Sequence, residues 1–358
     1  MLHIWALSGD EVAVFADHEV EGKSVRSLKT ELAKQIGIPR FRQKWLGEEH
    51  SELNDDDLVC SLNVQLLILD FKTPESGQGR QVISACDDDR VEDLEALLQQ
   101  PLTPEITDGS DRTPLQAAAG AGHVQCSELL LEARAEVDKG SKVTALVLAA
   151  RTGVPELVQL LLQARADTAK FSQDDGSTAL HETARHGHSE ALRLLLEAGA
   201  EIDKVSFFGK TALHMAAGNG HMEAVQLLLA AAADLEKAMR YGETALHLAA
   251  CHGRLGILQL MLQAGAGKDH VTSDGLTALH LAVVSGDPSV VRLLLEARAD
   301  KDKVTKTGAT AFQLAAVNAD LQVLQLLTGI DRDPPVDEVA TAPPALLCSC
   351  WGTEAGCI

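Results

Sequence analysis

The chain has 358 residues, with 31 Lys and Arg against 52 Asp and Glu, a formal net charge of −21, and 46% hydrophobic residues that include only 7 Phe, 3 Trp and 1 Tyr. A chain this acidic repels phosphate backbones and anionic lipid, so neither nucleic acid nor a membrane surface is expected as the principal partner. A core this poor in aromatic rings must be filled by Leu, Ala and Val, which favours closely packed helices over a β-sandwich.

Three features of the sequence bear on where the protein works. No apolar run is long enough for a transmembrane helix, and the first residues, MLHIWALSGDEV, lack the basic segment of a signal peptide. The cysteines are odd in number and scattered, unlike a disulfide framework. We therefore expect reduced thiols in an intracellular, cytoplasmic monomer, with the nucleus left open as an alternative.

Residues 1–72 show the pattern of a small α+β domain. Alternating apolar residues at Leu2, Ile4 and Ala6, and at Val12 and Val14, predict a β-hairpin around the Ser-Gly-Asp-Glu turn. A helix is predicted from about Lys23 to Gln35, ended by Gly37 and Pro39, with further strands at Gln43–Leu46 and Val64–Phe71. This order, with Gly37-Ile38-Pro39 after the helix and Arg42-Gln43-Lys44-Trp45-Leu46 at the third strand, resembles a ubiquitin-like (β-grasp) domain.

The resemblance implies docking, since a conjugated modifier ends in a free Gly-Gly and this chain continues beyond Phe71 through a linker at 73–79. It also implies a shallow apolar patch centred on the third strand. That patch would place Leu46, together with Lys44, on a candidate surface for ubiquitin-handling machinery. Two alternatives remain: Leu46 belongs to the core, and the domain only caps the rest of the chain.

A tetrapeptide built on Thr-Ala-Leu-His recurs in the middle of the chain. It begins at Thr178, Thr211, Thr244 and Thr277, at steps of 33 residues, with degenerate copies at Thr113, Thr144 and Thr310. A short apolar helix, a turn that usually contains Gly, and a second helix follow each anchor, and the Thr is suited to N-cap the first helix. These units resemble the ankyrin repeat, which has a 33-residue period and a T-P-L-H-x-A signature.

The resemblance covers about residues 80–330 and implies a mainly helical solenoid of about seven or eight repeats. The first repeat lacks the Thr anchor, as expected of a terminal unit, and its helix pair is supplied by Val82, Ala85, Val91, Leu94, Leu97 and Leu98. The second helix of a repeat commonly ends in a left-handed Gly, as at Gly199, and Arg165 stands at the equivalent place.

Residues 331–358 are predicted to be a disordered tail, because two Pro-Pro pairs stop the helical pattern. Cys348, Cys350 and Cys357 lack the spacing and the fourth ligand of a zinc site, and Ala355 stands where a prenylation box needs Cys. We expect neither a metal nor a cofactor.

The histidines do not indicate catalysis. His181, His214, His247 and His280 occupy the same place in successive repeats, where a ring can bond backbone groups of adjacent turns. A single catalytic site gives no reason for such recurrence. His181 and His186 resemble a zincin helix, but the second His is at i+5 rather than i+4. We expect no catalytic residues and no enzyme activity.

The connections between repeats, here called fingers, vary within the repeating frame. The candidate partner-binding residues on them are Phe171, Phe207, Phe208, Met239, Arg240 and Tyr241. Aromatic rings with Arg and Met concentrate binding energy at the centres of interfaces. Alternatively, one aromatic ring per finger packs on its own hairpin. The sequence thus predicts a non-enzymatic adaptor that binds a protein partner, with a structural scaffold as the alternative.

Overall fold

The computed structural model of the protein describes residues 1–6, 8, 10–47, 51–58, 63–69, 77–100, 102–140 and 142–328. The chain separates into two compact units, Met1–Gln173 and Asp174–Ile358. The predictions made for residues 331–358, including the three cysteines there, and for Phe71 and residues 73–76 fall outside the described residues.

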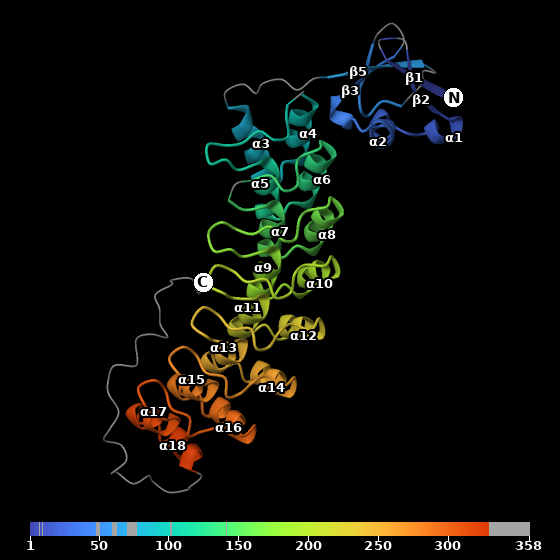
Figure 1. The fold of residues 1–358 in the computed structure, drawn as a ribbon. Coiled ribbons are helices and arrows are strands. Elements are labelled where there is room, and N and C mark those ends of the chain that lie inside the picture. The colour runs from blue at the N-terminus through green and yellow to red at the C-terminus, as the bar shows by residue number, and fades with distance from the viewer. Residues whose placement is uncertain are drawn as a thin grey trace. The chain divides into compact units, whose positions relative to one another are not determined.

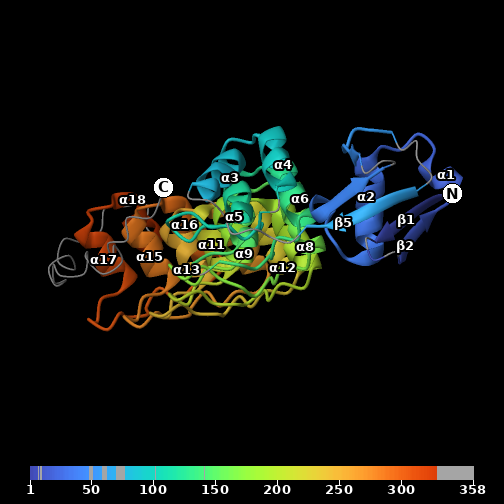
Figure 2. The same cartoon turned by 90° about the horizontal axis from the view of Figure 1, so that it is seen from above.

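The first unit begins with an N-terminal domain, residues 1–69, in which helix α2 crosses one face of a mixed sheet (Figures 1 and 2). Its elements are β1 (Leu2–Ala6), β2 (Glu11–Phe15), α1 (Asp17–Val20), α2 (Val25–Ile36), the 3-10 turn η1 (Arg40–Arg42), β3 (Gln43–Leu46), β4 (Glu52–Leu53) and β5 (Asn63–Ile68). The five strands lie in the order β2-β1-β5-β3-β4, with β1 and β5 parallel. This is the architecture expected of a β-grasp-like domain.

The core of the N-terminal domain lies between α2 and the sheet. Leu28 and Leu32 of α2 pack against Ile4, Trp45 and Val64 of the strands, and all five are 0% exposed. The ends of α2 follow from its flanking residues. Ser24 caps the first turn by accepting a hydrogen bond from the Ser27 N–H, and Gly37 ends the helix in the left-handed region at φ 72°.

Three details of the N-terminal prediction were wrong. The helix begins at Val25 and includes Ile36, and β5 ends at Ile68 rather than Phe71. The hairpin carries a bulge between Ile4 and Trp5, and Leu2 pairs with Phe15. Because a bulge shifts the alternation by one residue, Phe15 enters the core while Val14 stays 42% exposed.

The rest of the first unit consists of three helix pairs (Figure 1). They are α3 (Gln78–Asp87) with α4 (Val91–Gln99), α5 (Pro114–Ala121) with α6 (Val124–Glu132), and α7 (Ala145–Thr152) with α8 (Pro155–Gln163). The first pair buries Val82, Ala85, Leu94 and Leu98 without a Thr anchor, as the sequence predicted for a terminal repeat. Cys86 and Cys126 are buried in α3 and α6.

Up to Thr328, where the described residues end, the second unit contains five further helix pairs (Figure 1). They are α9 (Ala179–His186) with α10 (Ser189–Glu197), α11 (Ala212–Asn219) with α12 (Met222–Ala230), α13 (Ala245–Cys251) with α14 (Leu255–Gln263), α15 (Ala278–Ser285) with α16 (Pro288–Glu296), and α17 (Ala311–Val317) with α18 (Leu321–Thr328). Small and aliphatic side chains fill the core: Leu213, Ala216 and Ala217 of α11 meet Val225 and Leu228 of α12, all at most 1% exposed.

The chain reverses in the left-handed region after the second helices α6, α8, α10, α12, α14 and α16, whether or not a glycine is present. Gly199 and Gly265 have φ of 81° and 94°, and the equivalent Arg165, Ala232 and Arg298 have φ of 65°, 64° and 60°. A side chain at such a φ costs on the order of 1 kcal/mol. The sequence comparison of the repeats therefore located strained positions correctly.

Replacing Arg165 by Gly should raise the free energy of unfolding by about 1 kcal/mol, because the left-handed backbone then carries no Cβ. The measurement is the midpoint of urea unfolding. Arg165→Ala is the matched control, since Ala232 already occupies the same conformation, and it should leave the midpoint near that of the wild type. A midpoint of Arg165→Gly at or below that of Arg165→Ala contradicts the expectation.

Candidate partner-binding site

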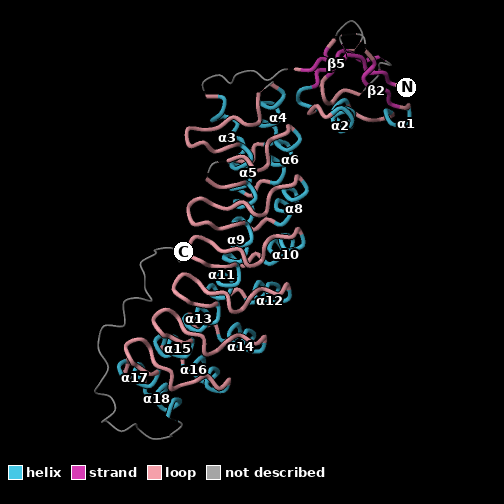
Figure 3. Tube along the Cα trace, viewed as in Figure 1, coloured by secondary structure: helices cyan, strands magenta, loops and turns pink. Residues whose placement is uncertain are grey.

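Neighbouring fingers of the second unit are joined by backbone hydrogen bonds at one repeated position. These bonds run from the N–H of Phe207 to Asp175, of Arg240 to Phe208, of Ser273 to Tyr241 and of Lys306 to Asp274, with N–O distances of 2.7–3.3 Å. Each bond joins residues 32 apart, so the tips of successive fingers lie side by side in a constant register. Figure 3 shows these connections as loops beside the odd-numbered helices.

Glycines at the finger turns permit this close approach. Gly209 and Gly242 adopt φ of 77° and 85°. A Cβ on either would lie 3.0 Å from the backbone nitrogen of the next finger, Arg240 or Ser273. At these two positions Gly is thus required both by the turn and by the neighbouring finger.

The aromatic side chains on two adjacent fingers are exposed. Phe207, Phe208 and Tyr241 expose 57%, 38% and 62% of their surface. Arg240 is exposed beside them, and Met239 is half-buried with its N–H bonded to the Glu243 carbonyl across the hairpin. The alternative was that each ring packs on its own hairpin. It fits Tyr241 least, because most of the surface of this side chain is exposed to solvent.

Arg240 carries an exposed positive charge. Among the described residues, its guanidinium forms no ion pair with a carboxylate. An exposed Arg between aromatic rings offers five donors in a planar fork, which suits carboxylates and carbonyl groups of a partner.

A second apolar row, which was not predicted from the sequence, lies on the fingers of the second unit. Val205, Val271 and Val304 are 44%, 41% and 54% exposed, and Ala238 is exposed at the equivalent place. The signal was present, because these residues stand 33 apart in the aligned frame. They extend the apolar surface of the second unit along four fingers.

The two remaining candidates lie in the first unit. Phe171 is 45% exposed. Leu46 is half-buried and lies on the sheet face opposite to the fully buried Trp45, paired with Gln65 of β5 and Glu52 of β4. Lys44 lies on the same face and forms an ion pair with Glu52. Leu46 is therefore not among the buried core residues of this domain.

The recurring Thr and His side chains form a capping box at the start of the first helix of a repeat. In α11 the Thr211 N–H donates to His214 Nδ1 at 3.2 Å, and the His214 N–H donates to the Thr211 hydroxyl at 3.4 Å. His214 Nε2 donates to the carbonyl of Glu243 in the next finger at 3.2 Å. The ring thus joins one repeat to the next and must be the neutral Nε2–H tautomer to do so.

The same capping contact recurs in the other repeats with this signature. His181 and His247 also bond through Nε2 to backbone carbonyls of the next repeat. Each Thr N–H donates to Nδ1 of its histidine at 3.1–3.2 Å, in the pairs Thr178–His181, Thr244–His247 and Thr277–His280. Burial lowers the pKa of all four histidines, and that of His214 and of His247 falls to about 4. The rings are neutral near pH 7, which matches the hydrogen bonds that they make.

One carboxylate is buried in the second unit at a position that other repeats fill with an apolar residue. Glu182 of α9 is 0% exposed, whereas Met215, Leu248 and Leu281 hold the equivalent place. Its oxygens lie 3.6 Å from Arg185 Nη1 and 3.5 Å from His186 Nε2. Comparison of the aligned repeats could have revealed this exception.

The buried thiols are poorly suited to nucleophilic chemistry. Burial raises the pKa of Cys86, and burial together with the Asp89 carboxylate raises that of Cys126 to about 12. Both thiols are therefore protonated near neutral pH. No group of three His, Cys, Asp or Glu side chains in the described ranges is placed to hold a metal ion.

Comparison with known families identifies the repeating part of the chain. The family model of ankyrin repeats (3 copies) matches residues 82–172, 135–206, 180–272 and 256–336. The chain belongs to the ankyrin repeat family. The ankyrin repeats mark it as carrying a protein–protein interaction module. No curated protein matches the chain.

Within the residues that the structure describes, no helix of this ankyrin repeat protein is long and apolar enough to cross a membrane.

Proposed function

We propose that the protein is a non-enzymatic adaptor whose ankyrin fingers bind a protein partner. The observation that carries the proposal is the exposed row of Phe207, Phe208, Arg240 and Tyr241 on two fingers held in register by the Phe208–Arg240 hydrogen bond. Aromatic rings and Arg on a rigid frame lose little conformational entropy on binding, so they are effective interface anchors. The partner chemistry that fits is an apolar segment bearing carboxylates, which would meet Arg240.

The N-terminal domain is proposed as a second docking module that uses the outer face of its sheet. The residues on this face, as given by strand pairing with Leu46, are Trp5, Gln65, Leu67 and Lys44. The face is partly apolar, which suits a protein ligand, and ubiquitin-handling machinery is the proposed partner class. We further propose that the adaptor acts as an intracellular monomer.

The test is affinity purification from the source cell with the full chain and with the triple variant Phe207→Ala, Arg240→Ala and Tyr241→Ala. Loss of three such side chains should weaken the binding of the principal partner by about 100-fold or more. Each such side chain typically contributes about 2 kcal/mol to binding when it is central in an interface. The matched control replaces Ser273, Asp274 and Thr307, which hold equivalent positions on the next two fingers.

Circular dichroism and the urea midpoint establish that the triple variant is folded. Partner recovery equal to that of the control variant would exclude the finger site. In the same experiment the Leu46→Lys variant should fail to recover a separate set of proteins. If this variant recovers every partner, the N-terminal domain is better explained as part of a structural scaffold than as a docking module.

A further inference from the structure

Arg40 is buried among three carboxylates that come from distant parts of the first unit. Its side chain is 4% exposed. Nη1 donates to Asp55 at 3.1 Å, Nη2 to Glu95 at 2.9 Å and Nε to Glu132 at 2.8 Å. Asp55 belongs to the N-terminal domain, whereas Glu95 lies in α4 and Glu132 ends α6, so the guanidinium links the N-terminal domain to the first two repeats.

Two further cations lie in the cluster. Arg26 Nη1 lies 3.1 Å from Glu95, and Lys29 Nζ lies 2.8 Å from Asp55. Arg26 also pairs with the exposed Asp56 at 3.4 Å. Burial by itself lowers the pKa of Arg40, but its hydrogen bonds to Glu132 and Glu95 outweigh burial and raise that pKa. A buried Arg is tolerated only where such partners are complete.

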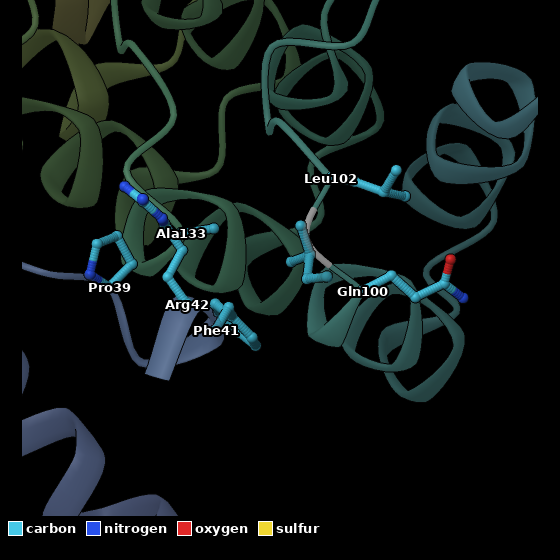
Figure 4. A pocket seen from close by; sticks show the side chains of 7 residues that line it. Pro39, Phe41, Arg42, Gln100, Leu102 and Ala133 are labelled. Atoms are coloured by element: carbon cyan, nitrogen blue, oxygen red, sulfur yellow. The ribbon is translucent and has the colours of Figure 1, made fainter. Parts of the chain in front are cut away.

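Apolar packing surrounds the ion pairs. Phe41, next to Arg40 in η1, is 7% exposed, and its ring centroid lies 3.9 Å from the Arg40 guanidinium carbon. Figure 4 shows Pro39, Phe41 and Arg42 facing Gln100, Leu102 and Ala133 of the first repeats. The space left between them is no larger than a water molecule, so the two surfaces are closely packed.

Leu98 and Leu102, at the end of α4 and just after it, are 3% and 6% exposed, and the side chains facing them across the packed space come from Pro39 and η1. The ion pairs of Arg40 reach both α4 and the end of α6. The N-terminal domain therefore lies along the second helices of the first two repeats.

We propose that the N-terminal domain and the first two ankyrin repeats fold as one cooperative unit, because Arg40 fixes the domain to α4 and α6 through Glu95 and Glu132. The α2 and η1 side of the domain is consequently occupied by the repeats. The sheet face with Leu46 is the side left for a partner, so this contact and a docking role are compatible. The inference does not depend on the proposed finger site.

The test uses the distribution of tryptophan. The chain has Trp5, Trp45 and Trp351, so in a Trp351→Phe background fluorescence follows the N-terminal domain alone. Far-ultraviolet circular dichroism follows mainly the repeat helices. Urea unfolding is recorded with both probes for the full chain, for Glu95→Gln with Glu132→Gln, and for a control with Glu92→Gln and Glu128→Gln. The control changes two exposed carboxylates on the same helices.

The fluorescence and dichroism transitions should coincide in the control and separate in the Glu95→Gln, Glu132→Gln variant, because the N-terminal domain then unfolds apart from the repeats. Hydrogen exchange of the α4 and α6 amides should accelerate by at least about tenfold in the variant relative to the control. Coincident transitions at the control midpoint, together with unchanged exchange in α4 and α6, would overturn the proposal.

Discussion

Lowering the pH from 7 to 5 should destabilise the repeats by about 4 kcal/mol through His214 and His247 alone. Both rings are buried, and their pKa falls from an ordinary value of 6.5 to about 4. At pH 5 the unfolded chain therefore binds a proton at each ring while the folded chain does not, which costs about 2 kcal/mol for each. Stability is complete above pH 6.5 and is lost as the pH falls toward 4.

The chain itself supplies the control for this prediction. Gln116 stands at the histidine position of its repeat, where it accepts from the Thr113 N–H at 2.8 Å and donates to the carbonyl of Val143. Gln313 accepts from the Thr310 N–H at 3.0 Å in the same way. A His214→Gln, His247→Gln variant should keep the capping boxes and lose most of the pH dependence, as measured by urea unfolding at pH 7 and pH 5. An equally steep loss in the variant would show that other groups cause it.

Glu182→Leu should raise the free energy of unfolding by about 1 to 4 kcal/mol. The carboxylate is fully buried, and side-chain nitrogens of Arg185 and His186 lie 3.5–3.6 Å from its oxygens, beyond a strong hydrogen bond. Removing it does not strand Arg185, whose Nη2 also donates to Asp175 at 2.7 Å. Leucine already fills the equivalent place in α13 and α15. Urea unfolding measures the change.

Replacing the other member of the ion pair, Arg185, distinguishes the cost of burying a charge from the effect of packing. Arg185→Leu removes the cation and leaves the buried Glu182 carboxylate, so it should destabilise by about 3 to 5 kcal/mol. If both variants shift the midpoint in the same direction, the ion pair is not what determines stability at this site.

The repeating part of the fold could be predicted from the sequence because its contacts are local and periodic. The Thr anchors located the first helices, since a capping residue such as Thr211 determines where a helix begins. Left-handed residues such as Arg165 were found by alignment with Gly199, without any knowledge of contacts. The exposed finger residues were located by the same alignment of repeats, because positions that vary between repeats are not needed for the shared core.

The features that could not be predicted depend on contacts between distant residues. Arg40 and Glu132 are 92 positions apart, and no spacing rule brings them together. The bulge opposite Trp5 shifted the alternation of β2, so Phe15 replaced Val14 in the core. The pairing of the N-terminal domain with the first repeats is likewise a matter of shape and charge at two surfaces rather than of periodic pattern.

The hydrogen bonds between fingers bear on how this protein could change over evolutionary time. Because each bond uses only backbone atoms at a fixed offset of 32 residues, it does not depend on the side chains of the two bonded residues, provided that the turn glycines such as Gly209 are kept. Duplication or loss of one whole 33-residue unit would restore the same junction, whereas an insertion of one or two residues within a fingertip would break it. The binding surface can thus lengthen or shorten in complete units while its individual side chains diversify freely.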